Sequence, residues 1–314
     1  MTKYFSHILV VGTIVLGTWC CNAKRPEIAS RIENGASEEP VKTPAPVADN
    51  LPKKRVSNRE ANEKGVVFIA EYHHIREGKS TMERSPDSFR KDLDRLYKLG
   101  FRPINVTEYL SGDYGLPPGA SPLILTFDDA NPSQIRFRDD GTLDPECGFG
   151  ILKEFADNHS DFPAKAVFFV LPELWGQPQH REKKVALVKE AGGEVANHTI
   201  THANLSKISD DDVKSEIGGA FRLLAPYHGN PEYLALPLGI SPKNKSLLTG
   251  FMHDGRQISV KAVFLVGANP APTAQSEKFN ATRIPRIQAC EGPMGLDYWL
   301  DQLEKGKVKP YVAP

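Results

Sequence analysis

The chain has 314 residues, which is ample for one large α/β domain. Its 39 Lys and Arg residues balance 39 Asp and Glu residues, so the formal net charge is zero. A protein that binds nucleic acid normally carries a basic excess, so this balance argues against a nucleic-acid partner. Hydrophobic residues make up 40% of the chain and charged residues 25%, which is typical of a globular protein.

The N-terminal segment, residues 1–23, reads as an export signal. A positive charge precedes an apolar run over residues 8–17, which is too short to span a bilayer but suits the core of a secretory signal. Cleavage after Ala23 and lipidation of Cys20 or Cys21 both fit the sequence, and an uncleaved anchor is a third interpretation. We therefore expect an exported protein of the periplasm, cell envelope or extracellular space, attached to the membrane if a cysteine carries lipid.

Residues 24–64 hold five prolines, many charges and almost no apolar periodicity. Such a stretch cannot bury enough apolar surface to offset the entropy of ordering it, so the sequence predicts a disordered linker. The folded domain is expected over residues 65–314. Its two cysteines, Cys147 and Cys290, do not by themselves establish a disulfide.

Within the domain, apolar runs of strand length alternate with helical patterns. The runs are continuous, which is typical of strands buried on both faces of a parallel sheet. The predicted strands cover residues 66–71, 123–127, 166–171, 194–197, 233–237, 262–266 and 283–287. The first predicted helix begins at Pro86 and ends before Gly100, and the others cover residues 145–158, 181–191, 210–224 and 295–305. This order predicts a (β/α) barrel or an open doubly wound sheet, with functional residues past the carboxyl ends of the strands.

Two adjacent carboxylates, Asp128 and Asp129, directly follow the predicted strand 123–127. Side by side they repel each other unless a cation or hydrogen-bond donors compensate. The simpler explanation for such a pair is a solvated loop start or a helix N-cap. The pair alone therefore indicates only a candidate site.

Two histidines, His198 and His202, follow the predicted strand 194–197. Four residues apart, they share one face of a helical turn, whereas in an extended strand they would be about 13 Å apart. One metal ion cannot bridge that distance with bonds of about 2.1 Å, so chelation requires the chain to curl after Asn197. Two imidazoles and one carboxylate have the composition of an open catalytic metal site.

With these motifs, the chain resembles the polysaccharide deacetylase family (NodB homology, carbohydrate esterase family 4) over about residues 65–305. The run from Thr126 to Asp129 resembles that family's first motif, and the run from His198 to His202 resembles its second, in the family's order and spacing. The opening run from Tyr72 to Ile75, followed by Ser85 to Phe89, is similar to the start of many bacterial members.

The resemblance implies a distorted (β/α) barrel with fewer strands than the regular eight. It implies that Asp128 is the general base and that Asp129, His198 and His202 hold a divalent metal. Zinc is the first expectation for imidazole ligands, and cobalt, nickel or manganese fit the same set. The implied reaction is hydrolysis of acetyl groups, N-acetyl above all, from an envelope or exported polysaccharide such as peptidoglycan, a poly-N-acetylglucosamine or acetylated xylan.

Two features of the family are missing. Ala235 stands where the third motif has the arginine that orients the base, and the late Leu-x-His motif that supplies the acid has no match. We expect Arg286, or else Arg283, to replace that arginine. The other expected pocket residues are His73, His74 and Pro237. The acid stays open between the two histidines and the proton returned to Asp128.

The missing features also favour a rival hypothesis, a carbohydrate-binding protein that keeps the barrel but has lost turnover. A third hypothesis, a structural envelope lipoprotein, draws only on the N-terminus. Acetate release from glucosamine oligomers with added metal distinguishes the first two. The sequence gives no indication of the oligomeric state.

Overall fold

The computed structural model describes residues 54–228 and 232–314. The expected export signal and most of the predicted linker lie outside these residues. Residues 57–62, which the sequence analysis placed in the linker, contact the folded domain. Ser57 Oγ and Arg59 donate to the carbonyl oxygen of Gly119 at 2.7 and 2.9 Å, and Asn62 pairs with Val312. This segment is held by polar and backbone groups, which an argument from apolar periodicity does not detect.

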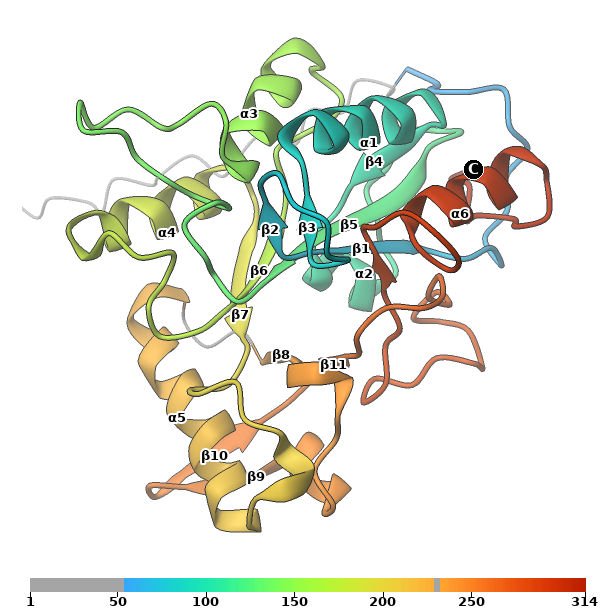
Figure 1. Ribbon diagram of the computed structural model, residues 1–314. Coiled ribbons are helices and arrows are strands. Elements are labelled where there is room, and N and C mark those ends of the chain that lie inside the picture. Colours follow the sequence, from blue (N-terminus) through green and yellow to red (C-terminus); the bar gives the residue numbers. More distant parts are fainter. Residues whose placement is uncertain (1–53, 229–231) are drawn as a thin grey trace, which may run out of the picture. The chain divides into compact units, whose positions relative to one another are not determined.

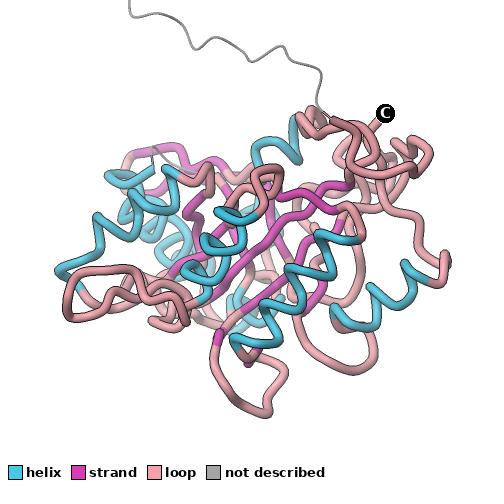
Figure 2. Tube along the Cα trace, turned by 90° about the horizontal axis from the view of Figure 1, so that it is seen from above, coloured by secondary structure: helices cyan, strands magenta, loops and turns pink. Residues whose placement is uncertain are grey.

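Eight strands form one parallel sheet that curls into a barrel (Figures 1 and 2). In spatial order they are β11 (Ala262–Phe264), β8 (Tyr233–Ala235), β7 (Glu194–Asn197), β6 (Val167–Val170), β5 (Ser121–Asp128), β1 (Phe68–Tyr72) and β12 (Ile287–Gln288), with β4 (Phe101–Pro103) beside the start of β5. The segment before β12 closes the sheet on itself, because Ile284 exchanges hydrogen bonds of 2.9 Å with Val263 and Leu265. The arrangement is the distorted barrel that the resemblance implied, not the open sheet.

All seven predicted strands are present. β7 has the predicted bounds, the ends of the other six are shifted, and the last is the most altered. Only Ile287 and Gln288 form β12, so Arg283 to Arg286 lie before the strand. The sequence analysis missed β4 and two small sheets, β2 (His74–Ile75) with β3 (Glu83–Arg84) and β9 (Gly250–His253) with β10 (Arg256–Ser259). The Asp254-Gly255 turn, with φ of 46° and 71°, was an available signal for the β9–β10 hairpin.

Helices cover the outside of the barrel (Figure 1). They are α1 (Pro86–Lys98), α2 (Val106–Ser111), α3 (Gly148–Asn158), α4 (Arg181–Glu190), α5 (Asp210–His228) and α6 (Leu296–Glu304). Ser85 caps α1 by accepting the Ser88 amide. α3 starts three residues later than predicted, because Cys147 occupies its N-cap, and α2 was not predicted.

Within the described ranges, no helix has the length and apolar character needed to cross a membrane.

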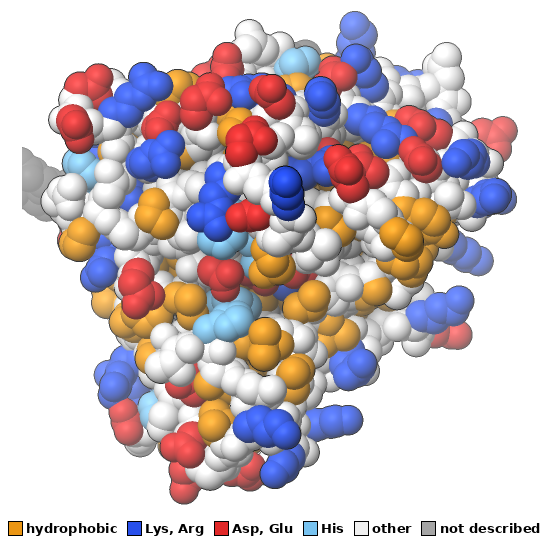
Figure 3. Space-filling model, in the orientation of Figure 1, with side chains coloured by type: hydrophobic (Ala, Val, Ile, Leu, Met, Phe, Trp, Pro, Cys, Tyr) orange, Lys and Arg blue, Asp and Glu red, His pale blue; other side chains and the backbone are white. Residues whose placement is uncertain are grey.

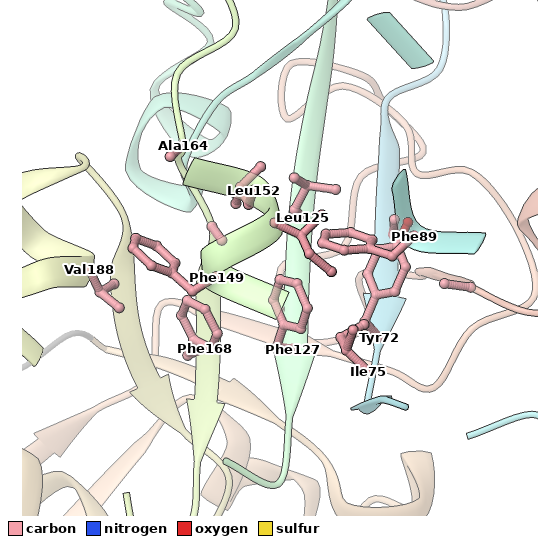
Figure 4. Close-up of a cluster of buried hydrophobic side chains, with 14 of the residues drawn as sticks. Tyr72, Ile75, Phe89, Leu125, Phe127, Phe149, Leu152, Ala164, Phe168 and Val188 are labelled. Atoms are coloured by element: carbon pink, nitrogen blue, oxygen red, sulfur yellow. The ribbon is translucent and has the colours of Figure 1, made fainter. Parts of the chain in front are cut away.

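Alternation along the strands separates two apolar layers. Phe127 and Phe168 face outward and stack with ring centroids 4.9 Å apart, between Phe149 of α3 and Phe89 of α1 (Figure 4). The intervening residues of the same strands face inward and fill the barrel. The continuous apolar runs in the sequence reflect this burial on both faces.

Candidate metal and catalytic site

At the carboxyl ends of the strands, the barrel interior changes from apolar to charged. Glu71 on β1, Asp128 on β5 and Arg286 before β12 occupy inward-facing positions, and each is at most 1% exposed. Charged groups buried together must pair to offset the cost of leaving water. Figure 3 shows histidine side chains near the middle of the same face, beside acidic and hydrophobic side chains.

Asp129, His198 and His202 bring three ligand atoms together. Asp129 Oδ1 lies 3.3 Å from His198 Nε2 and 3.6 Å from His202 Nε2. All three atoms fall within 4.8 Å of one another. Among the described residues, Asp129 Oδ1 has no hydrogen-bond partner although it is buried. A carboxylate oxygen left without a donor and facing two imidazole nitrogens fits a divalent cation.

The chain curls directly after β7, as the spacing of the two histidines requires. Thr199 and His202 have φ of 69° and 57°, in the left-handed region. Asn197 Oδ1 accepts the Thr199 amide at 2.7 Å, and Glu216 on α5 accepts the Thr201 amide at 2.8 Å. These bonds offset the backbone strain and keep both imidazoles on one side of the loop.

A backbone carbonyl fixes the tautomer of His198. His198 Nδ1 lies 3.0 Å from the Ala235 oxygen, which can only accept, so Nδ1 carries the proton and Nε2 presents its lone pair to Asp129. Burial lowers the pKa of His198, but Asp128 and Asp129 outweigh this and raise it. A metal ligand must be neutral, so protons compete with a cation at this imidazole.

Asp128 is held by Arg286. The two terminal guanidinium nitrogens donate to Asp128 Oδ1 and Oδ2, both at 2.7 Å, and Nε donates to the Leu265 oxygen at 2.7 Å. Burial alone would raise the pKa of Asp128, but Arg286 and His198 outweigh it and hold that pKa well below its usual range. Arg286 thus makes the contact with Asp128 that the sequence analysis expected, whereas Arg283 is exposed and lines a separate surface pocket.

The side chains of Asp128 and Asp129 point in different directions because the backbone turns between them. Asp129 and Ala130 have φ of 73° and 51°, so the strand ends abruptly after Asp128. Asp128 therefore points to Arg286 in the barrel interior while Asp129 points to the histidines. Strain of this kind persists only where the surroundings impose it, and it gathers at functional sites.

Sequence reasoning missed two buried residues of the site. Gln134 Nε2 donates to the backbone oxygens of His73, at 2.8 Å, and of Asp128, and Gln134 Oε1 accepts from Trp175. Glu71 Oε2 accepts the Gly267 amide at 2.7 Å, and burial is the main cause that raises the pKa of Glu71 to about 7. Gln134 gave no signal in its polar loop, but an acidic residue inside the apolar run of β1 was a signal for Glu71.

The remaining predicted pocket residues divide into two groups. His73 is buried beside Glu71, with Nε2 3.6 Å from Glu71 Oε1. Pro237 is buried in the turn that follows β8. His74 is half-buried and lies in β2, and its place in the pocket stays a prediction. Cys147 and Cys290 are both free.

Residues 116–250 match the family model of polysaccharide deacetylases, and this range contains both the aspartate pair and the histidine pair. The match confirms the resemblance to polysaccharide deacetylases that the motifs indicated. No curated protein matches it.

Solved structures share the fold at low sequence identity. The deacetylase PplD from Streptococcus pyogenes, solved with acetate, is 19% identical with a TM-score of 0.58, covering 79% of this chain and 100% of that one. A polysaccharide deacetylase from Bacillus cereus is 15% identical with a TM-score of 0.56, covering 77% and 69%. IcaB from Ammonifex degensii is 18% identical with a TM-score of 0.52, covering 77% and 96%. These likenesses establish the fold.

Proposed function

We propose that this protein is a metal-dependent hydrolase that removes N-acetyl groups from a polymer built on N-acetylglucosamine. One observation carries the proposal. Three metal-ligand atoms from Asp129, His198 and His202 converge within 4.8 Å, next to an aspartate whose two oxygens are fixed by Arg286.

Asp129, His198 and His202 would hold the cation, with zinc as the first expectation and cobalt, nickel or manganese as alternatives. When bound, such a cation polarises the acetyl carbonyl and lowers the pKa of the attacking water. Asp128 accepts the proton of that water as general base, because its low pKa keeps it ionised and Arg286 fixes its orientation.

The leaving amine needs a proton, and we assign this role to His73. The imidazole is buried, and one of its nitrogens lies within 4.8 Å of carboxylate oxygens of Asp128 and Glu71. Three chemical roles are then filled from separate strands: a base on β5, metal ligands after β5 and β7, and an acid after β1.

The rival hypothesis of a carbohydrate-binding protein without turnover rested on the missing arginine and the missing late histidine. Arg286 and His73 supply side chains of the same types from other positions, which supports catalysis over binding alone. We further propose export of the protein, on the strength of the apolar run over residues 8–17.

The test is acetate release from N-acetylglucosamine oligomers by the purified chain, together with elemental analysis of its metal. We expect close to one divalent ion per chain and loss of acetate release after chelation, restored by added zinc. Sugar binding without metal-dependent acetate release would favour the rival instead.

A further inference from the structure

Glu71 is a buried side chain of the site that has no role in the mechanism proposed above. Glu71 is 1% exposed and belongs neither to the metal-ligand group nor to the base. Its Oε2 accepts the Gly267 amide and lies 3.5 Å from Arg286 Nε. Its other oxygen, Oε1, is buried and has no hydrogen-bond partner within the described residues. An unsatisfied buried carboxylate oxygen is costly, so its presence calls for an explanation.

A second metal ion is a poor explanation. Glu71, His73 and Asp128 do bring ligand-type atoms within 4.8 Å of one another. However, Arg286 already donates to both oxygens of Asp128, and its Nε faces Glu71. A cation there would lie beside a guanidinium and would be repelled by it.

An imidazole lies close to the free oxygen. His73 Nε2 lies 3.6 Å from Glu71 Oε1. The His73 backbone is fixed, because its carbonyl oxygen accepts from Asn131 Nδ2 at 3.0 Å and from Gln134 Nε2 at 2.8 Å. The orientation of the ring is therefore what Glu71 can still determine. A small rotation closes a gap of 3.6 Å, and catalytic hydrogen bonds are often long before substrate binds.

We propose that Glu71 is a positioning residue that orients the His73 imidazole through Nε2, so that Nδ1 is presented to the leaving nitrogen of the substrate. Nδ1 is buried and has no partner among the described residues, so it is available for this contact. This inference rests on the proposed function, in which His73 is the acid. The protons balance: Asp128 takes one from the attacking water, and His73 gives one to the nitrogen as the carbon–nitrogen bond breaks.

Two substrates with different leaving groups test whether Glu71 acts in the protonation of the leaving nitrogen. An amine cannot leave without a proton, whereas the phenolate of 4-nitrophenyl acetate can. We expect Glu71→Gln to lower kcat for N-acetylglucosamine oligomers by about 10- to 100-fold, the usual cost of losing a carboxylate that orients an imidazole. KM, metal content and turnover of 4-nitrophenyl acetate should change little. Equal losses on both substrates, or no loss on the amide, would overturn the proposal.

A double-mutant cycle separates positioning from a general structural effect. If Glu71 acts through His73, adding Glu71→Gln to His73→Gln should cost no further activity on the amide. Additive losses would contradict the inference. The matched control is Glu194→Gln, which alters another carboxylate that accepts backbone amides, at Val106 and Thr107, away from the site; it should leave amide turnover unchanged.

A spectroscopic measurement does not depend on activity. In metal-free protein, the imidazole ¹⁵N resonances of His73, assigned with His73→Gln, should shift in Glu71→Gln while those of His198 stay in place. Unchanged His73 resonances would refute the inference even if the enzyme is an active metal-dependent deacetylase. Absence of acetate release by the wild type, in contrast, would refute the proposed function itself.

Discussion

Arg286 and Asp128 lie 158 positions apart in the sequence, yet two parallel hydrogen bonds of 2.7 Å join them inside the barrel. The guanidinium also faces Glu71, so one buried cation serves two buried carboxylates. The planar guanidinium of arginine donates two parallel hydrogen bonds to the two oxygens of a carboxylate, which the ammonium group of lysine cannot do. The contact fixes the orientation of the Asp128 carboxylate, and no residue of the strand β8 takes part in it.

Removing the guanidinium should therefore affect stability as well as rate. Arg286→Ala leaves Asp128 and Glu71 buried without a cation, and we expect the free energy of unfolding to fall by about 3–5 kcal/mol. Arg286→Lys keeps the charge but loses the two parallel hydrogen bonds, so it should retain more stability and still lose turnover. Urea unfolding measures the first effect. The control is Arg283→Ala, at an exposed position nearby, with an expected change within about 0.5 kcal/mol.

The two aspartates should separate metal binding from catalysis. Asp128→Asn is expected to keep the metal and to lower kcat by about 10²- to 10⁴-fold, because the general base is lost. Asp129→Asn should weaken metal affinity, because it removes a charged ligand. Metal titration and acetate release, measured on both variants, check the assignment. Wild-type turnover in Asp128→Asn would mean that another residue is the base.

The two histidines should be equally necessary for the metal but unequal in stability. His198→Ala and His202→Ala are both expected to abolish tight metal binding, as measured by elemental analysis after dialysis. His198 is buried and bonded to Ala235, whereas the His202 side chain is 33% exposed, so only His198→Ala should also lower the melting temperature of the metal-free protein. Stoichiometric metal in either variant would contradict the ligand assignment, and His180→Ala serves as the control.

Glu71 should make the free energy of unfolding depend on pH. Its pKa is about 7 in the folded chain and 4.5 for the free group, chiefly because of burial. Between these values the folded state binds more protons than the unfolded state, so the free energy of unfolding falls as pH rises from about 4.5 to about 7. In Glu71→Gln this fall should be smaller. Urea unfolding at several pH values measures this difference. If the free energy of unfolding changed with pH by the same amount in the wild type and in Glu71→Gln, the pKa shift would be contradicted.

The segment before residue 65 should contribute to stability. Ser57 and Arg59 bond to Gly119, and Asn62 bonds to Pro310 and pairs with Val312. Each such hydrogen bond contributes about 0.5–1.5 kcal/mol. We expect a chain that begins at residue 65 to melt at a lower temperature than one that begins at residue 54. Equal melting temperatures would mean that these contacts contribute nothing in solution.

The candidate metal-ligand residues could be chosen from the sequence because their signals are local. A buried strand followed by two aspartates, and another followed by His-x3-His, indicate where parallel strands end and what chemistry lies there. The curl after Asn197 was a condition that the spacing itself imposed. The barrel followed from the order of the elements and from the family resemblance.

The rest of the site depends on pairings between distant segments. Gln134 acts by joining the backbones of His73 and Asp128, and nothing in its own neighbourhood indicates that role. The sequence favoured Arg286 over Arg283, but the physical reason is the register of the last segment, where Ile284 bridges to Phe264. His73 and His74 were both expected in the pocket because they lie at the end of the first predicted strand, although alternation sends neighbouring side chains to opposite faces.

The last strand of the barrel, β12, pairs with the first, β1, through Ala70 and Ile287. The barrel therefore cannot close until residue 287 has left the ribosome, and contacts of such long sequence separation slow folding. Until then Asp128 has no guanidinium beside it, although the aspartate pair and the histidine pair have already been made. The arrangement of the candidate site thus depends on synthesis of this last segment, and a chain truncated before residue 286 should lack activity even if its earlier strands have paired.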